Sequence, residues 1–195
     1  MRQALAIVSF LFLFSRLSAQ TTLVHTSLEK AVAAENSGTP VLALDLSKDK
    51  LTDIPEEIRE FKSLEKLILN KNKLDSLPVW LKELKHLNYI QADKNLFETF
   101  PPVLLEMDSL RVIKLGDNMI DAIPIDIDQL DHLEWLGLWS NVIRDFPASL
   151  GDLISLKVLD ILYNDMTFEE QSWLKELLPG IIIEMSEPCR CNFDE

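Results

Sequence analysis

The chain has 195 residues, of which 47% are hydrophobic and 26% charged, a balance that suits one globular domain and excludes a disordered or fibrous chain. Its formal net charge of −13 argues against nucleic acid as the main partner, because such binding depends on clustered Lys and Arg residues that neutralise phosphates.

Residues 1–19 are predicted to be a cleaved secretory signal peptide. Arg2 supplies a basic start, residues 4–14 are apolar, and Ala19 ends a suitable cleavage site. A membrane anchor is the alternative, but this apolar run falls short of the roughly 20 residues that span a bilayer. We therefore expect a secreted or periplasmic protein that does not span a membrane after cleavage, with the choice between the two compartments left open.

Residues 20–40 are predicted to form a helical cap. Thr26 and Glu29 have the spacing of a capping box, and apolar residues recur at helical spacing from Leu28 onward. Gly38 marks the end of this helix.

Residues 41–166 form a tandem array. Blocks of 23 residues follow one another without insertion, as in LEKLILNKNKLDSLPVWLKELKH from Leu64 to His86. Five complete blocks are followed by a partial sixth, and the blocks begin at Val41, Leu64, Leu87, Leu110, Leu133 and Leu156. One such block has no partner for its leucines, so the blocks are expected to bury their leucines against one another.

The shared pattern, L-x-x-L-x-L-x-x-N-x-L-x-x-L-P-x-x-I/L, resembles the leucine-rich repeat of the 23-residue class. The resemblance implies an α/β solenoid, a curved horseshoe with a parallel sheet on its concave face and turns or short helices outside. Secreted bacterial leucine-rich-repeat proteins are similar, and they often open with a short helix before the first repeat.

A polar column recurs at the strand exit of every block. Its members are Asp49, Asn72, Asn95, Asn118, Asn141 and Asn164. A short amide at this point is expected to satisfy backbone groups of the turn, and a polar binding track is the less favoured alternative.

Residues 167–195 are predicted to close the array with a second helix, an edge strand and a tail. Thr167 and Glu170 have capping-box spacing, and Phe168, Trp173 and Leu174 are expected to face the core. Residues 181–185 are the expected edge strand, which follows the helix stop at Pro179 and Gly180.

The tail holds the only two cysteines, Cys189 and Cys191. They are expected to pair in an oxidising compartment and staple the tail, although a disulfide across one residue departs from relaxed geometry, and a bond to another chain is equally open. Two cysteines alone do not complete a zinc site.

Alternation along the strands predicts that Trp135 and Trp139 point to the concave face, opposite the buried Leu136 and Leu138. The predicted ligand-binding residues on this face are Tyr89, Met119, Trp135, Trp139, Leu162 and Tyr163. A basic edge is predicted at Lys48, Lys50, Lys66, Lys71, Lys73 and Lys94. Gly116 and Gly137 are expected to leave a hollow floor between the large side chains. The alternative is that the rings merely pack on one another and stiffen the sheet.

The expected function is binding of a protein or peptide ligand, because Trp and Tyr dominate interface energetics. Glycan or cell-envelope binding through the aromatic patch and a passive structural scaffold are the alternatives. No catalytic set and no cofactor motif is apparent, and a carboxylate pair such as Asp160 and Asp165 would have to be close and perturbed to change this.

Metal sites are also not expected. His86 and His132 lie two repeats apart, too far to share one ion. The acidic run at Asp126, Asp128 and Asp131 lacks the glycine and terminal glutamate of a calcium loop, so it is read as a solvated outer turn.

Overall fold

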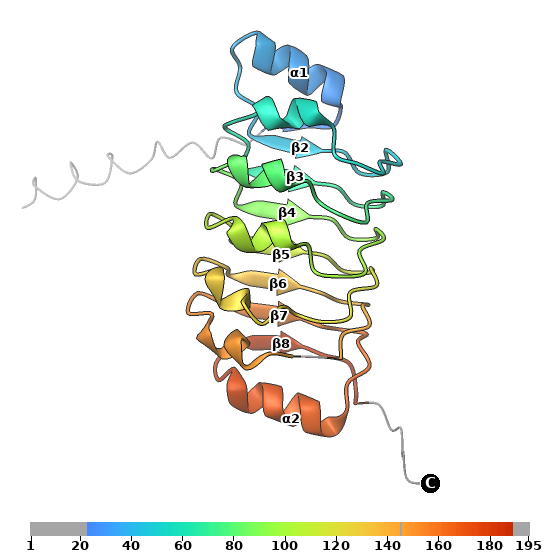
Figure 1. The fold of residues 1–195 in the computed structure, drawn as a ribbon, viewed down its shortest axis with the longest axis vertical. Helices are drawn as coiled ribbons and strands as arrows, with labels where there is room; N and C mark the ends of the chain where they lie inside the picture. Colours follow the sequence, from blue (N-terminus) through green and yellow to red (C-terminus); the bar gives the residue numbers. More distant parts are fainter. Residues whose placement is uncertain (1–22, 145, 189–195) are drawn as a thin grey trace, which may run out of the picture.

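The computed structural model describes residues 23–144 and 146–188, which stack into one elongated solenoid (Figure 1). Its spine is a single parallel sheet of eight strands in which each strand pairs with the next one along the chain. The strands are β1 (Val24–His25), β2 (Ala43–Asp45), β3 (Lys66–Ile68), β4 (Tyr89–Gln91), β5 (Val112–Lys114), β6 (Trp135–Gly137), β7 (Val158–Asp160) and β8 (Ile182–Glu184).

The pairing register equals the repeat length. Ala43 pairs with Lys66 and Lys66 pairs with Tyr89, so partners stand 23 residues apart, and the same step continues to β7. Residues at one repeat position therefore form rows across the sheet. This confirms the predicted repeat frame.

Short 3-10 helices cover one side of the sheet, as the turns and helices in front of the strands in Figure 1 indicate. They are η1 (Glu56–Glu60), η2 (Val79–Glu83), η3 (Pro102–Glu106), η4 (Ile127–Gln129) and η5 (Ala148–Asp152). All but η4 follow a proline directly, which suits a helix start because proline fixes φ and lacks an amide hydrogen.

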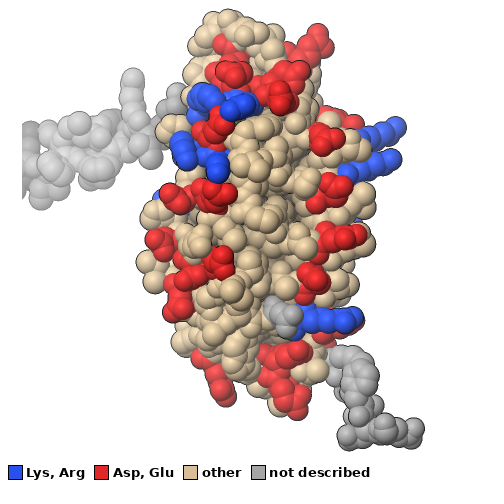
Figure 2. Space-filling model, viewed as in Figure 1, with Lys and Arg blue, Asp and Glu red and all other residues tan. Residues whose placement is uncertain are grey.

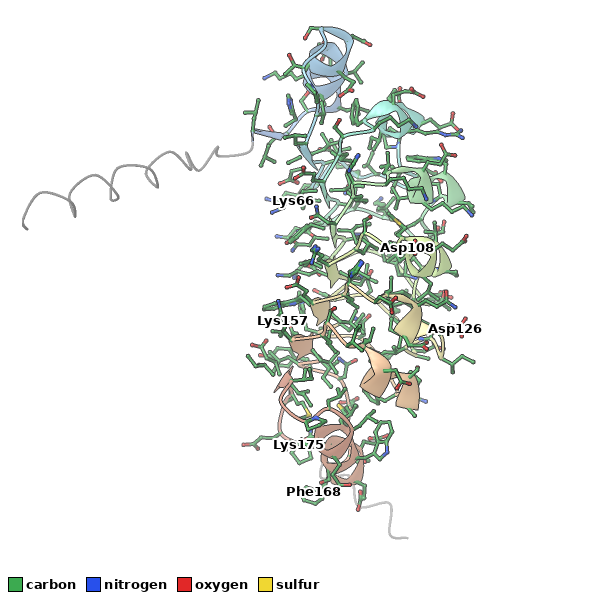
Figure 3. All side chains as sticks on the ribbon, turned by 90° about the vertical axis from the view of Figure 1, so that its left-hand side faces the viewer. Lys66, Asp108, Asp126, Lys157, Phe168 and Lys175 are labelled. Carbon is green, nitrogen blue, oxygen red and sulfur yellow. The ribbon has the colours of Figure 1, made fainter. Side chains whose placement is uncertain are left out.

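The core lies between the sheet and these helices. Leu67, Ile90, Ile113, Leu136 and Leu159 enter it from the strands and are fully buried. From the helix side it receives Ile58, Leu81, Leu104, Ile127 and Leu150. Figure 3 separates the two surfaces, with Lys66 and Lys157 on the strand side and Asp108 and Asp126 on the helix side.

The asparagine column forms a buried ladder that holds the turns after the strands. The Asn118 side-chain nitrogen donates to the carbonyls of Ala92 (3.2 Å) and Leu115 (2.9 Å), and its oxygen accepts from the amide of Asn95 (3.1 Å). The other asparagines of the column repeat this pattern, whereas Asp49 in the first repeat is exposed. The column is thus structural, as predicted, but it starts at the second repeat.

Helix α1 (Leu28–Asn36) caps the first end of the array. Its N-cap is Ser27, whose hydroxyl accepts from the amide of Lys30 (3.4 Å). The predicted box between Thr26 and Glu29 is therefore wrong, because the helix begins one residue later and its third position is a lysine. Strand β1, which precedes this helix and pairs with β2, was not predicted.

Helix α2 (Phe168–Leu177) caps the other end. Thr167 and Glu170 form the predicted capping box, in which each side chain accepts from the other residue's amide, at 3.2 and 2.7 Å. Strand β8 lies within the predicted edge strand.

The predicted inner face of α2 is wrong for its two aromatic residues. Phe168 is 68% exposed and Trp173 is 40% exposed. The helix buries Gln171, Leu174 and, at its C-cap, Leu178, which share one helical face, so both rings fall on its flanks.

The predicted signal peptide and the Cys189 and Cys191 tail lie outside the described residues. Within residues 23–144 and 146–188, no helix has the length and apolarity needed to cross a bilayer.

Candidate binding surfaces

The exposed side of the sheet, called the strand face below, carries three rows of side chains set by the register. The first row is Ala43, Lys66, Tyr89, Val112, Trp135 and Val158. The second row is Asp45, Ile68, Gln91, Lys114, Gly137 and Asp160. Ser47, Asn70, Asp93, Gly116, Trp139 and Leu162 follow two residues later in each repeat and form the third row.

Trp135 and Trp139 lie on the strand face, half-buried, over the two glycines. A Cβ atom on Gly116 would overlap the Trp139 indole, and one on Gly137 would stand 3.4 Å from the Trp135 ring nitrogen. The predicted hollow floor is therefore wrong. The missing side chain of Gly116 makes room for the Trp139 indole, whereas a Cβ atom on Gly137 would only be in ordinary contact with Trp135.

Lysines cover the aromatic rings. The Lys66 ammonium lies 4.2 Å from the ring centre of Tyr89, that of Lys114 lies 4.7 Å from Trp135, and that of Lys94 lies 5.5 Å from Trp139. Such cation–π contacts are worth about 0.5–1 kcal/mol at exposed sites and more where water is excluded. The strand face thus interleaves positive and aromatic groups, instead of separating them into a cationic end and an aromatic end.

A chain of hydrogen bonds orders the centre of this face. The Tyr89 hydroxyl donates to Gln91 (2.9 Å), the Gln91 amide donates to Asp93 (2.6 Å), and Asp93 accepts from the amide of Gly116 (2.7 Å). Burial, aided by the charge of Asp93, raises the pKa of the Tyr89 hydroxyl, which keeps it a neutral donor. The polar groups are therefore held in one arrangement before any ligand binds.

The Trp135 ring nitrogen is a buried donor with no acceptor among the described residues. An unpaired buried donor of this kind costs about 1–3 kcal/mol, and such groups concentrate where function compensates for them. It lies on β6, beside Gly137 and in the ring that Lys114 covers.

Asp160 is a carboxylate of the strand face whose ionisation is perturbed by its surroundings. Burial raises the pKa of Asp160, and the charge of Glu184 adds to this, while a hydrogen bond from the amide of Leu162 opposes it. Its neighbour in the sheet is Glu184, whereas Asp165 is exposed on the turn beyond the strand. The register therefore gives Asp160 a neighbour in Glu184, not in Asp165.

A second surface, the rim, follows the strands at the right-hand edge of Figure 1. Its first row has left-handed backbone at every position, with φ between 53° and 69°. This row is Lys48, Lys71, Lys94, Asp117, Ser140 and Tyr163. In each repeat the residue after this row belongs to the asparagine column. The residue after that belongs to the second row of the rim, which is Lys50, Lys73, Leu96, Met119, Val142 and Asp165.

The rim separates residues that the sequence placed in one site. Met119 is 45% exposed and Tyr163 is 71% exposed, and both belong to the rim, while Tyr89, Trp135 and Trp139 are half-buried on the strand face. Lys66, predicted on the basic edge, instead lies over Tyr89. Leu162 is half-buried at the end of the third row.

Lys114 was missed as a functional residue. The 23-residue frame placed it on the second row, diagonal to Trp135, but charge alone did not distinguish it from the solvated lysines. Its position over an indole became visible only with side-chain geometry.

No group of three His, Cys, Asp or Glu side chains within the described residues could hold a metal ion.

The solved structures that are similar to this chain include two bacterial proteins. A leucine-rich-repeat protein of Leptospira interrogans matches with a TM-score of 0.65 and 29% identity, over 69% of this chain and 34% of the other. Internalin C2 of Listeria monocytogenes matches with a TM-score of 0.60 and 21% identity, over 75% of this chain and 62% of the other, and shows the fold alone. No model of a protein family and no curated protein matches the chain.

Repeat frame, parallel sheet and structural neighbours together define an α/β solenoid of the leucine-rich-repeat type, and the chain is a leucine-rich-repeat protein. It spans about a third of the Leptospira chain and less than two thirds of the internalin chain.

Proposed function

We propose that this protein is a secreted or periplasmic binding protein whose strand face holds a protein or peptide ligand. The observation that carries the proposal is the set of three lysine–aromatic pairs on one exposed sheet face. Large rings held in fixed positions lose little entropy on binding, and Trp and Tyr dominate interface energetics.

Electrostatics favours a ligand with carboxylates. Lys94 reaches over from the rim and already pairs with Asp117 (2.9 Å), but Lys66 and Lys114 stand on the strand face itself, on a chain of net charge −13. Their ammonium groups are positioned by the rings beneath them, so an acidic group of the ligand can pair with them without ordering a free side chain.

Glycan binding is less favoured for a geometric reason. A sugar stacks on the bare face of an aromatic ring, whereas three rings of the strand face are covered by lysines. A sugar would have to displace these side chains first.

The test compares ligand capture by the parent and by Trp135→Ala/Trp139→Ala, using crosslinking to extracellular and periplasmic fractions of the source cells. Phe168→Ala/Trp173→Ala is the matched control, because it removes two exposed rings from the cap instead. Circular dichroism establishes that all three proteins are folded. Capture by the parent and the control, with loss in the strand-face variant, supports the proposal.

Equal capture by all three proteins would show that the rings only stiffen the sheet. Release by soluble oligosaccharide would indicate a glycan ligand, and absence of any specific capture would favour a passive scaffold. Export is tested separately by intact mass, since cleavage after Ala19 leaves a chain that starts at Gln20.

A further inference from the structure

The side chains in the second row of the rim change from basic to apolar along the solenoid, and the proposed strand-face site does not involve them. It runs from Lys50 and Lys73 through Leu96, Met119 and Val142, five positions here called the rim stripe. The three apolar members are 46%, 45% and 51% exposed. Consecutive exposed apolar side chains in a single file mark an interaction site more often than scattered ones do.

Backbone hydrogen bonds fix the stripe as one continuous structure. The amides of Lys73, Leu96, Met119 and Val142 each donate to a carbonyl of the preceding repeat, at 2.8–3.0 Å. The buried asparagine ladder lies directly before each of these residues. The amide groups of these four positions are therefore already satisfied by the repeat array.

The basic end of the stripe is electrostatically available. Lys50 and Lys73, with Lys48 and Lys71 in the first row beside them, are exposed and form no ion pair with another described residue. Lys94, by contrast, pairs with Asp117 at 2.9 Å. Figure 2 shows positive side chains projecting from this edge in the upper half of the molecule.

From this order we infer that the rim stripe docks an amphipathic α-helix of a protein partner, with carboxylates at one end of its contact face and apolar residues at the other. Neighbouring stripe positions follow the strand spacing of about 4.8 Å, close to the 5.4 Å pitch of an α-helix. A partner helix that lies along the stripe can therefore place one side chain per turn beside each of the five stripe positions. An extended strand, with same-face residues about 6.7 Å apart, does not.

A membrane surface is the competing occupant, because lysines and apolar side chains also bind anionic lipid. The stripe is one side chain wide, and the chain carries a net charge of −13, which an anionic bilayer repels. These two features favour a helix over a bilayer.

The experiment selects displayed helical peptides of about five turns against the purified full chain. Three libraries share an apolar half and differ in the other half, which is acidic, basic or uncharged. We expect enrichment of the acidic library, and about tenfold weaker binding of the selected peptides by Leu96→Glu/Val142→Glu.

Two variants make the result specific. Ile125→Glu/Ile154→Glu is the matched control, because these isoleucines are 79% and 84% exposed outside the rim stripe and should leave binding unchanged. Lys50→Glu/Lys73→Glu should shift enrichment to the basic library. The Trp135→Ala/Trp139→Ala variant should still bind the selected peptides, which would show that the rim stripe and the strand face are separate sites.

The inference is overturned by any of three results. These are no enrichment of the acidic library, equal loss of binding in the isoleucine control, and sedimentation with phosphatidylserine vesicles that Leu96→Glu/Val142→Glu abolishes. The last result would assign the rim stripe to a membrane.

Discussion

At the scale of single residues, the turns after the strands depend on two features acting together. Left-handed backbone at the first row of the rim turns the chain, and the following asparagine satisfies the groups that the turn leaves unpaired. Only the second feature is visible as a residue type. The left-handed position holds Lys, Asp, Ser and Tyr. None of these residue types indicates a positive φ from the sequence, as a glycine would.

We expect Asn118→Ala to lower the free energy of unfolding by about 2–4 kcal/mol, because it leaves several buried backbone groups without partners. Asp49→Ala, at the exposed equivalent position, should change it by less than about 0.5 kcal/mol. Urea unfolding followed by circular dichroism measures both. Similar values for the two variants would contradict the ladder's structural role.

Ionisation of Asp160 should oppose stability. Its pKa is raised in the folded protein by burial, so the folded state binds its proton more tightly than the unfolded chain does. The stabilisation from that proton is present at acidic pH and is lost as pH rises through the raised pKa. Asp160→Asn should therefore stabilise the protein at neutral pH and have little effect below about pH 3.

Unfolding midpoints in urea across this pH range provide the measurement. Glu184→Gln is the informative companion, because it removes the neighbouring charge that also raises the pKa of Asp160. A benefit of Asp160→Asn that is the same at all pH values would exclude ionisation as its cause.

At the scale of elements, the two caps protect the ends of the solenoid in different ways. Helix α2 starts with a reciprocal capping box, while α1 starts with a single bond that the Lys30 amide donates to the Ser27 hydroxyl at 3.4 Å. Each cap also supplies a strand, β8 or β1, that covers the edge of the repeat sheet.

Thr167→Ala should lower the free energy of unfolding by about 1 kcal/mol, since it removes the N-cap acceptor of α2. Ser27→Ala should have a smaller effect, because the bond that it removes is long. Thermal unfolding of the two variants beside the parent tests this order. An equal or larger loss for Ser27→Ala would mean that the capping box contributes little.

At the scale of the whole molecule, the register makes the repeats interchangeable as units. Deleting residues 67–89 joins Lys66 to Ile90 and keeps the 23-residue frame, so we expect a shorter solenoid that still unfolds cooperatively. The free energy of unfolding of this shorter protein should fall less steeply with urea concentration, because less surface is exposed on unfolding.

Deleting residues 67–88 removes one residue fewer and is the control for this prediction. The extra residue falls inside a strand, where a shift of one position exchanges the buried and exposed faces. We expect this protein to lose the cooperative transition. Equal stability of the two deletions would contradict the importance of the frame.

The sequence by itself determined the repeat length, the buried rows, the asparagine ladder and the start of the second cap, because each of these follows from local spacing of residue types. The same frame predicted that Trp135 and Trp139 lie on the strand face. Phe168 and Trp173 were misplaced because which helix face is buried depends on the final repeat, not on the helix alone.

Only the tertiary structure decided how the surface groups combine. The Trp139 indole fills the space over Gly116 of the preceding repeat, and Lys94 and Lys114 reach over Trp139 and Trp135 from earlier repeats. The frame says which residues share a face, but long side chains choose their contacts by packing and electrostatics across neighbouring strands. For that reason the sequence assigned residues to rows, whereas only the structure shows which side chains of neighbouring rows contact one another.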